Sequence, residues 1–337
     1  MRDRWSVVAP FFSDGGRDRW IDDFVTNRRW RFEKVPIAAR DDWHTRSKRT
    51  TGLSKWRQYW EQSKRAFPSA GIITVFPQPA LAVALRKYLR RTNVPLIAWC
   101  FNLGDYPTGI KQVMARAAFK NVDRFVVHST GEIRLVAEFL DVSDDRVEFV
   151  PLQRAPIPIV AREDDGDPFI VSMGSANRDF GTFLQAARIS RLPCKVVASP
   201  RALEGLDVPD NVSVMHGLTP VECHTLVQRS RFSVVPLADV GVASGQVTVI
   251  ESMRMDRAVV ATKSIGTTDY IDDARTGLLV PPHDPAALAA VMTQLWEDRA
   301  TRESLAQNAA RFAKESLSDE AAAKALIRII GDVELSR

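Results

Sequence analysis

A loop of small residues between a predicted strand and a predicted helix is the segment best suited to chemistry. The apolar run Arg231–Pro236 ends before this loop, and a helix is predicted to begin near Gln246, directly after Ser244 and Gly245. Free N–H groups at a helix start, beside a glycine that permits close approach, form a site suited to phosphate. Glu251 lies more than one turn into this helix, so it can reach the hydroxyls of a sugar or ribose. The sequence therefore predicts a phosphate site at Ser244, Gly245 and Gln246 next to a hydroxyl-binding carboxylate.

A second polar loop follows the predicted strand Pro168–Met173 and contains Asn177 and Arg178. Ligands of open α/β sheets bind beyond the carboxyl ends of the strands, where this loop is expected. The guanidinium fork is well shaped for phosphate oxygens, so Arg178 is predicted to contact a phosphate. The alternative is an ordinary surface ion pair between Arg178 and Asp179 or another acid.

The first half of the chain offers further candidates at predicted strand ends. Gly15-Gly16 follows the first strand, Asn102 and Asp105 follow the fourth, and His128 ends the fifth. Asn102 and Asp105 can hydrogen-bond an acceptor hydroxyl, although capping and turn formation suit both residue types. A simple turn at Gly15-Gly16 and a hydrogen-bonded core histidine at His128 are the corresponding alternatives.

No metal or cofactor is expected. His216 and His224 have no carboxylate at ligand spacing, and no Asp-x-Asp pattern indicates a metal-bound diphosphate. The three cysteines are widely spaced, which favours neither a disulfide framework nor a zinc site. No Gly-x-Gly-x-x-Gly follows the first strand, so a dinucleotide dehydrogenase is disfavoured.

The elements that position these loops alternate between short apolar runs and longer helix-like segments. The chain has 337 residues, more than one hydrophobic core usually serves, and continuous apolar runs indicate strands of a parallel sheet buried on both faces. We therefore predict an α/β fold with two Rossmann-like, doubly wound domains that face each other across a ligand-binding cleft. The polar segment 163–168 is the predicted linker. The predicted parts are an N-terminal domain (1–163), a second domain (164–315) that holds the predicted phosphate site, and a C-terminal helix (316–337) that can cross back to the first domain.

The six strands predicted in each half are short. They are, in the first half, Ser6–Ala9, Lys34–Ile37, Gly71–Phe76, Pro95–Phe101, Arg124–His128 and Arg146–Val150, and in the second Pro168–Met173, Lys195–Ala198, Asn211–His216, Arg231–Pro236, Ala258–Thr262 and Gly277–Val280.

Positive charge is concentrated in the first half. Residues 1–150 hold 26 Lys and Arg against 17 Asp and Glu, although the whole chain has a formal charge of only +5. Residues 46–91 contain a single acid, Glu61, and Trp56, Trp60 and Phe67 recur there at near-helical spacing. A basic helix with an aromatic stripe suits an anionic membrane surface, but a stripe that faces the core gives the same pattern. No recognised nucleic-acid module accompanies the basic residues.

No apolar run is long enough to span a bilayer, and the N-terminus does not resemble a signal peptide. The expected location is therefore cytoplasmic, at the inner face of the cell membrane if the basic stripe binds lipid.

The second half resembles the retaining nucleotide-sugar glycosyltransferases of family four (glycosyltransferase group 1), which have the GT-B fold. The matching segments cover about a third of the chain in the family's order: 244–246, 250–253, 258–262, 276–282 and 284–288. The resemblance implies a nucleotide diphosphate sugar as donor, retention of anomeric configuration and a glycan or lipid-linked acceptor in bacterial polysaccharide or glycoconjugate synthesis. It implies that Glu251 binds the ribose, that Arg178 contacts the leaving diphosphate, and that Gly15-Gly16 lies near the donor phosphate.

Two departures from the family's pattern stand out. Ala243 occupies the position of the first of two glutamates, and no lysine follows Arg178 before Lys195. The proposed catalytic set is Arg178, Glu251 and Asp105. The rival interpretation is a non-catalytic subunit that binds a nucleotide sugar.

Overall fold

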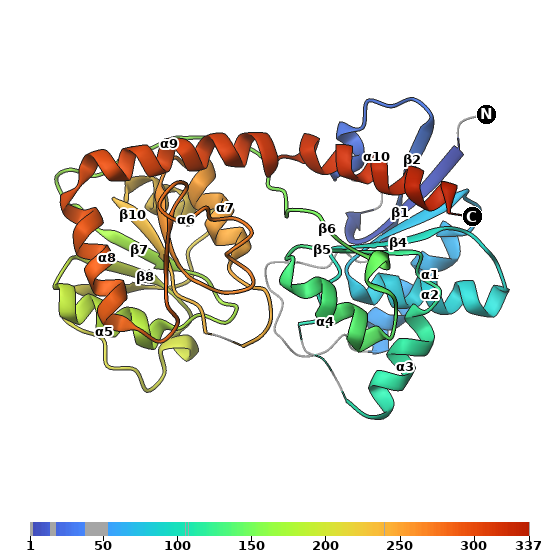
Figure 1. Ribbon diagram of the computed structural model, residues 1–337, viewed down its shortest axis with the longest axis horizontal. Coiled ribbons are helices and arrows are strands. Elements are labelled where there is room, and N and C mark those ends of the chain that lie inside the picture. Colours follow the sequence, from blue (N-terminus) through green and yellow to red (C-terminus); the bar gives the residue numbers. More distant parts are fainter. Residues whose placement is uncertain are drawn as a thin grey trace. The chain divides into compact units, whose positions relative to one another are not determined.

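The computed structural model describes residues 3–13, 18–37, 53–104, 106, 108–238 and 240–336 (Figure 1). Gly15, Gly16 and Asp105 lie outside the described residues. The chain divides into two compact units, unit 1 (Met1–Val150 and Ala322–Arg337) and unit 2 (Pro151–Ala321). Each unit contains a six-stranded sheet, and every strand pair in both sheets is parallel. The predicted α/β class with two doubly wound parallel sheets is confirmed.

Unit 1 has the strand order β2-β1-β3-β4-β5-β6. Alternate residues of its central strands belong to two separate core clusters, which shows that both faces of the sheet are buried. Its strands are β1 (Asp3–Ser13), β2 (Trp30–Ile37), β3 (Gly71–Val75), β4 (Leu96–Trp99), β5 (Arg124–Val127) and β6 (Val147–Phe149). Its helices are η1 (Ile21–Phe24), α1 (Leu53–Ala66), α2 (Pro77–Arg90), α3 (Ile110–Phe119), α4 (Gly131–Leu140), η3 (Asp144–Arg146) and most of α10 (Asp319–Leu335).

The two faces of the unit 1 sheet are covered by different parts of the chain. Residues of α1 to α4 pack on one face, whereas α10 packs on the other through Leu326, Ile329 and Ile330. The indole N–H of Trp30 donates a 2.8 Å hydrogen bond to Oε1 of Glu334 and holds the end of α10. From Ala322 onward, α10 is therefore part of unit 1.

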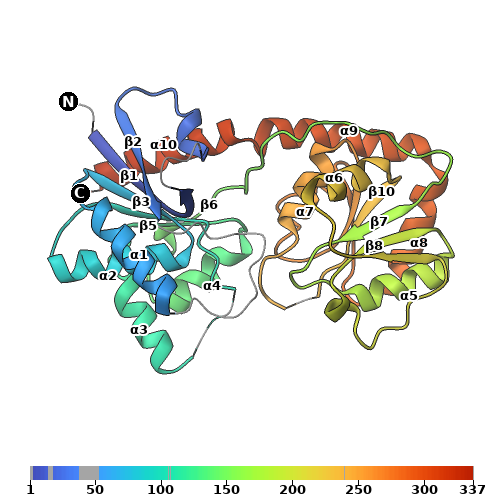
Figure 2. The same cartoon turned by 180° about the vertical axis from the view of Figure 1, so that it is seen from behind.

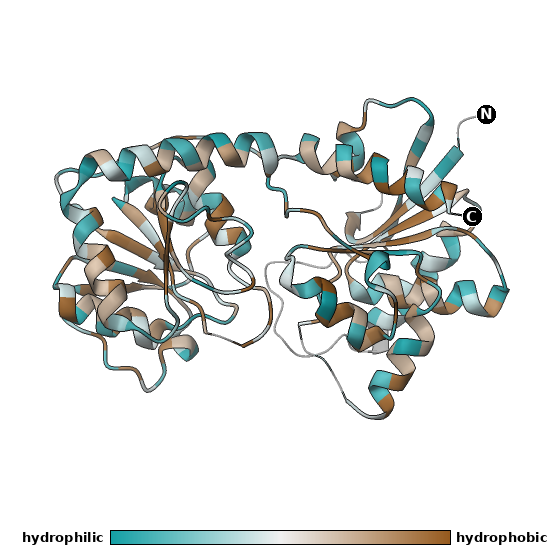
Figure 3. Ribbon diagram, in the orientation of Figure 1, coloured by the Kyte–Doolittle hydropathy of each residue, from teal (hydrophilic) through white to brown (hydrophobic). Residues whose placement is uncertain are grey.

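Unit 2 has the strand order β12-β11-β10-β7-β8-β9. The central strands of both sheets are largely hydrophobic (Figure 3), as the continuous apolar runs predict, whereas β2 at the edge of the unit 1 sheet carries Arg31, Glu33 and Lys34. The strands are β7 (Ile170–Met173), β8 (Cys194–Val197), β9 (Val212–Met215), β10 (Phe232–Val235), β11 (Ala258–Thr262) and β12 (Leu278–Val280). The helices are α5 (Phe180–Ser190), η4 (Pro200–Leu203), α6 (Pro220–Arg229), α7 (Gln246–Arg254), α8 (Pro285–Glu297) and α9 (Arg299–Ser316). The predicted N-cap of α8 is present, since the Asp284 side chain accepts from the backbone N–H of Ala287.

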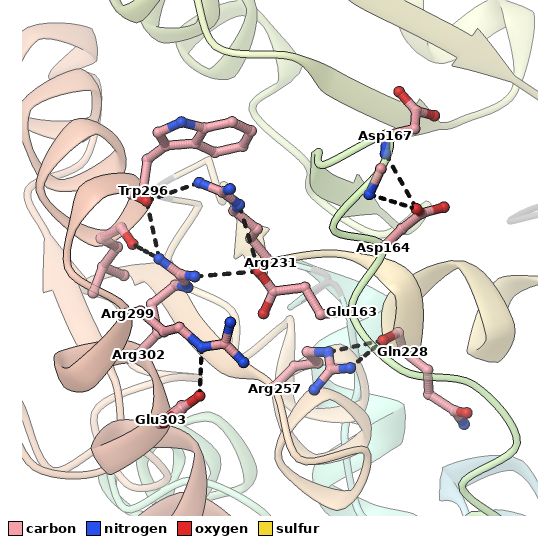
Figure 4. Close-up of polar contacts among 12 residues, drawn as sticks. Glu163, Asp164, Asp167, Gln228, Arg231, Arg257, Trp296, Arg299, Arg302 and Glu303 are labelled. Carbon is pink, nitrogen blue, oxygen red and sulfur yellow. Dashed lines mark hydrogen bonds and ion pairs between the residues drawn. The ribbon is translucent and has the colours of Figure 1, made fainter.

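Residues 151–163 belong to unit 2. The sequence pattern instead places them in the first domain, whose predicted end is residue 163. The backbone N–H groups of Val160 and Ala161 donate to Oε1 of Gln228 at 2.7 and 2.9 Å. Glu163 forms ion pairs with Arg231 and Arg302, whose guanidinium groups also donate to the backbone oxygen of Trp296 (Figure 4). Hydrogen bonds to Gln228 and ion pairs of Glu163 therefore hold this stretch on unit 2.

The aromatic stripe of α1 turns largely inward. Phe67 is buried, and Trp56 packs edge-to-face on the buried Tyr59 with ring centroids 6.4 Å apart. The central carbon of the Arg86 guanidinium lies 4.0 Å from the ring centroid of Trp60. The structure thus agrees with the core-facing alternative for this stripe. Within the described part of the chain, no helix has the length and apolarity needed to cross a membrane.

Candidate functional site

Three loops of unit 2 meet because the strands that precede them are neighbours. β10 pairs with both β7 and β11, so the loops after these strands leave the same edge of the sheet. Backbone hydrogen bonds join the first two loops, since the N–H of Ala238 donates to the oxygen of Asn177 at 3.0 Å. The N–H of Leu237 donates to Oγ1 of Thr262 at 2.9 Å and joins the third. The structure therefore brings together the two loops that carry the predicted phosphate-binding residues.

Arg178 is fixed by three hydrogen bonds at this edge. Its Nε donates to the backbone oxygen of Met173 at 3.0 Å, its Nη1 to that of Ala176 at 2.8 Å, and its Nη2 to Oγ1 of Thr248 at 2.8 Å. Burial lowers the pKa of Arg178 to about 10, which leaves the group charged at neutral pH. Each Nη atom has a second N–H that these bonds leave available for a ligand.

Asp179 does not neutralise Arg178. The Asp179 carboxylate accepts from the backbone N–H of Thr182 at 2.9 Å and lies 3.1 Å from Nδ1 of His283. Within the described ranges, no carboxylate lies at ion-pair distance from Arg178. A positive charge without a protein counter-ion favours an anionic ligand.

The start of α7 adds a second electropositive group. Gly245 is the N-cap with φ of +87° and no side-chain cap, so the N–H groups of the first turn have no partner within the helix. Thr248, which accepts from Arg178, belongs to this turn. The guanidinium and the positive end of the α7 dipole therefore act on the same small region. Ser244 and Gln246 flank Gly245 and are mostly buried.

Glycines allow the close packing of these loops. A Cβ at Gly174 would lie 2.3 Å from Nη2 of Arg178, and one at Gly266 would lie 2.4 Å from the backbone N and O of Ser244. Neither contact is possible for a side chain without displacement of its neighbour. Gly174, Gly266 and Thr248 are thus residues of the site that sequence reasoning missed. Only Thr248 had a sequence signal, because it lies in the first turn of the predicted helix.

Glu251 lies in the second turn of α7 and is already engaged. Its Oε1 pairs with Nη2 of Arg154, and its Oε2 lies 3.7 Å from Nε2 of His224. Arg154 is itself held by a 3.0 Å hydrogen bond from its backbone N–H to the oxygen of Leu317. A ribose hydroxyl would have to share this carboxylate with Arg154, so the ribose role of Glu251 stays a prediction. Ala243, one position before Ser244, is buried.

The two described candidates of unit 1, Asn102 and His128, have structural partners. Oδ1 of Asn102 accepts from the backbone N–H of Gly104 at 2.8 Å, which is a turn-forming contact. His128 is buried, with Nδ1 2.7 Å from the oxygen of Val150 and Nε2 2.9 Å from Sγ of Cys100. Burial lowers the pKa of His128 to about 4 and raises that of Cys100 to about 12. The assigned neutral tautomer therefore donates a hydrogen bond from Nδ1 to the oxygen of Val150 and accepts a hydrogen bond at Nε2 from the Cys100 thiol. These contacts describe a hydrogen-bonded core histidine.

The buried histidine predicts a pH-dependent stability of unit 1. Because the pKa of His128 falls from 6.5 to about 4 on folding, its contribution is complete above pH 6.5 and is lost as pH falls towards 4. This loss amounts to about 3 kcal/mol. In His128→Asn the amide N–H can replace the donor to Val150, and the pH dependence between 6.5 and 4 should be weaker by that amount.

Urea unfolding followed by tryptophan fluorescence measures this difference, since all tryptophans except Trp296 belong to unit 1. Burial raises the pKa of Asp22 to about 7, which favours the folded state as pH falls, but this contribution is common to both proteins and cancels in the comparison. Equal pH dependence in the two proteins would contradict the assignment.

Among the described residues, no group of three His, Cys, Asp or Glu side chains is arranged to hold a metal ion.

A known sequence family matches part of the chain. The family described as "Glycosyl transferases group 1" matches residues 168–298, which contain β7 to α8. These residues include Arg178, the first turn of α7 and the glycines that pack beside them. Residues 168–298 are therefore similar to a group 1 glycosyl transferase domain. The matched residues make up most of unit 2.

A characterised relative supports the same assignment over a shorter stretch. The alpha-D-kanosaminyltransferase of Streptomyces kanamyceticus is 33% identical over 89 residues. The alignment covers 26% of this chain and 23% of the relative.

Solved structures share the fold of the whole chain. A glycosyltransferase from Rickettsia africae superposes with a TM-score of 0.69, 13% identity and coverage of 98% of both chains. Anabaena HepE, solved in complex with UDP-glucose, gives a TM-score of 0.67 and 12% identity over 98% of this chain and 100% of its own. Two Rossmann-like sheets and these neighbours define a GT-B-type fold, as the sequence predicts.

Proposed function

We propose that this protein is a glycosyltransferase that takes a sugar from a nucleotide diphosphate sugar, with the diphosphate held in unit 2 between Arg178 and the start of α7. The observation that carries the proposal is the guanidinium of Arg178, which has no carboxylate partner among the described residues and is hydrogen-bonded to Thr248 in the first turn of α7. The group 1 domain match supports the same reaction class.

The chemistry follows from the charges at the site. The bond between the anomeric carbon and the terminal phosphate oxygen breaks, an acceptor hydroxyl oxygen bonds to that carbon, and the hydroxyl proton passes to the departing phosphate. Positive charge develops on the sugar ring and negative charge on the leaving group. Arg178 and the N–H groups of α7 stabilise the negative charge where it grows, which is the main contribution of the protein in this scheme. Retention of anomeric configuration is part of the proposal and rests on the family resemblance.

The donor, acceptor and location complete the proposal. UDP sugars are the first donors to test, because Anabaena HepE has been solved with UDP-glucose. The acceptor is a glycan or lipid-linked molecule of bacterial polysaccharide or glycoconjugate synthesis, met at the inner face of the cell membrane. The one Asp-x-Asp pattern of the sequence, Asp165-Gly166-Asp167, precedes β7, whereas the Arg178 loop follows that strand. The diphosphate charge is therefore assigned to Arg178 and α7, and turnover should persist in EDTA.

A donor screen by thermal shift tests the proposal. UDP-, GDP-, ADP- and TDP-sugars are added to the wild-type protein, and one class should raise the melting temperature of unit 2. A ligand at about 100 times its Kd stabilises the folded state by about 2.7 kcal/mol. The same donor should release its nucleotide when an acceptor extract is supplied. Absence of any shift with all four classes would refute the donor site.

A second candidate function is a non-catalytic subunit that binds a nucleotide sugar. Ala243 favours it, because no carboxylate stands where the resemblance places one near the donor sugar. The engagement of Glu251 by Arg154 favours it as well. Nucleotide binding without any nucleotide release, across donors and acceptor extracts, is the result that would select this candidate.

A further inference from the structure

Helix α3 presents an apolar stripe to solvent. Ile110, Val113 and Met114 are 78%, 65% and 66% exposed. Their spacing places them on one face of the helix, whereas Phe119 at its end is buried in the core of unit 1. An ordinary surface helix turns its apolar side chains inward, so this outward stripe is unusual for a helix covered only by water.

Helix α2 repeats the pattern. Tyr88 and Leu89 are each 66% exposed and Leu85 is 37% exposed, again with helical spacing. α2 contacts α3, and the buried faces of both helices contribute to the same core cluster. The two helices therefore cover the same face of the unit 1 sheet, which is seen with α1 in Figure 2. Exposed apolar side chains on two neighbouring helices that cover one face of a sheet mark an interaction surface.

The charge of α1 to α3 is almost entirely positive, whereas α4, which contacts α3, carries the exposed Glu138. α2 and α3 contain no acidic residue, and α1 contains only Glu61. Lys111 lies within the α3 stripe, and Arg90 and Arg91 follow Leu89 directly. The exposed basic residues of this face are Arg57, Lys64, Arg65, Arg90, Arg91, Lys111 and Lys120. Lys87, by contrast, is buried and paired with Asp123.

We propose that the α2–α3 surface, defined by Leu85, Tyr88, Leu89, Ile110, Val113 and Met114, docks unit 1 on an anionic lipid bilayer. The apolar side chains enter the boundary between headgroups and acyl chains, and the surrounding Lys and Arg side chains contact lipid phosphates. A second copy of the chain suits the surface less well, because two such basic faces would repel each other. The surface differs from the α1 stripe that the sequence indicated, since that stripe faces the core.

The idea that a lipid-linked acceptor reaches the protein at this surface rests on the proposed function. Binding of the surface to lipid does not require a nucleotide-sugar donor, so the lipid-binding proposal and the donor-site proposal can fail separately. A protein that binds vesicles but no nucleotide sugar would keep the surface and refute the donor site, and the converse result would do the opposite.

Vesicle co-sedimentation tests the surface with the full-length protein. Wild-type protein should bind vesicles of phosphatidylglycerol and phosphatidylcholine, bind phosphatidylcholine alone weakly, and lose much of its binding at high salt. Ile110→Glu/Met114→Glu should reduce binding to the anionic vesicles by about tenfold or more, since it removes two inserted side chains and adds negative charge. Tyr88→Glu/Leu89→Glu, on α2, should also reduce binding to the anionic vesicles.

Ile189→Glu is the matched control, because Ile189 is a 57% exposed apolar residue of α5 in unit 2. It should bind vesicles like the wild type. Circular dichroism of each variant reports folding, and the second double variant serves if the first does not fold. Three results would overturn the proposal: no binding of the wild type to anionic vesicles at low salt, equal binding of wild type and both double variants, or a wild-type dimer that Ile110→Glu/Met114→Glu dissociates without any vesicle binding.

Discussion

Replacement of Arg178 by alanine is expected to lower nucleotide-sugar turnover by about 100-fold or more, the range found when one preorganised donor to a developing anion is removed. The structure gives the reason, since Arg178 is the positive side chain that is fixed beside the start of α7 by Thr248. The melting temperature should change little, because the variant strands no buried carboxylate. Steady-state release of nucleotide measures the first effect, and thermal unfolding measures the second.

Arg178→Lys separates charge from geometry. A lysine keeps the charge but cannot bond to Met173, Ala176 and Thr248 at once while it offers two more N–H groups. Its activity should therefore lie nearer to that of the alanine variant than to that of the wild type. Arg188→Ala is the matched control, since Arg188 is an exposed arginine of unit 2 that pairs with Asp207.

Gly174→Ala tests the same idea without removing the guanidinium. The new Cβ would meet Nη2 of Arg178 at 2.3 Å, and the φ of +127° disfavours any side chain there. Turnover should fall, with a loss of nucleotide affinity, although the sequence still contains Arg178. If Arg178→Ala retained wild-type turnover and nucleotide affinity, the proposed phosphate site would be wrong.

The central strands, such as β3, β4, β10 and β11, were predictable because each is a continuous apolar run buried on both faces of a parallel sheet. The contact between the Asn177–Arg178 loop and the Ser244–Gln246 loop was predictable for a related reason, since both loops follow strands of one parallel sheet. The N-cap at Asp284 was readable from a local Asp-Pro pair. Strands and helix caps can be predicted because the pattern that indicates each of them lies within one segment of the sequence.

The features that escaped prediction depend on contacts between distant segments. The aromatic stripe of α1 has the same spacing whether it meets lipid or the core, and only the packing of Tyr59 and Phe67 decides between them. Residues 151–163 are assigned by the sequence to the first domain, but Gln228 and Arg302 bind them to unit 2 from far along the chain. Glu251 is readable as a ligand for hydroxyls, whereas its partner Arg154 lies 97 residues away.

Gly266→Ala is expected to destabilise unit 2 by about 1–3 kcal/mol, the usual cost of an added methyl group in a well-packed site. The new Cβ would lie 2.4 Å from the backbone N and O of Ser244, and backbone cannot yield as the end of a flexible side chain can. The loop that ends at Gly245 must therefore move. Since Gly245 caps α7, the first-turn N–H groups should lose their aim at the diphosphate.

Two measurements follow the Gly266→Ala change. Thermal unfolding should show a lower melting temperature, and nucleotide-sugar affinity should fall even at temperatures where the variant is fully folded. Gly181→Ala is the matched control, because a Cβ there meets its nearest atom at 3.5 Å in the first turn of α5. That change should leave affinity unaltered and stability equal or higher, since alanine restricts the unfolded chain. Loss of stability in Gly266→Ala with wild-type affinity would show that the Ser244 loop packs there without shaping the phosphate site.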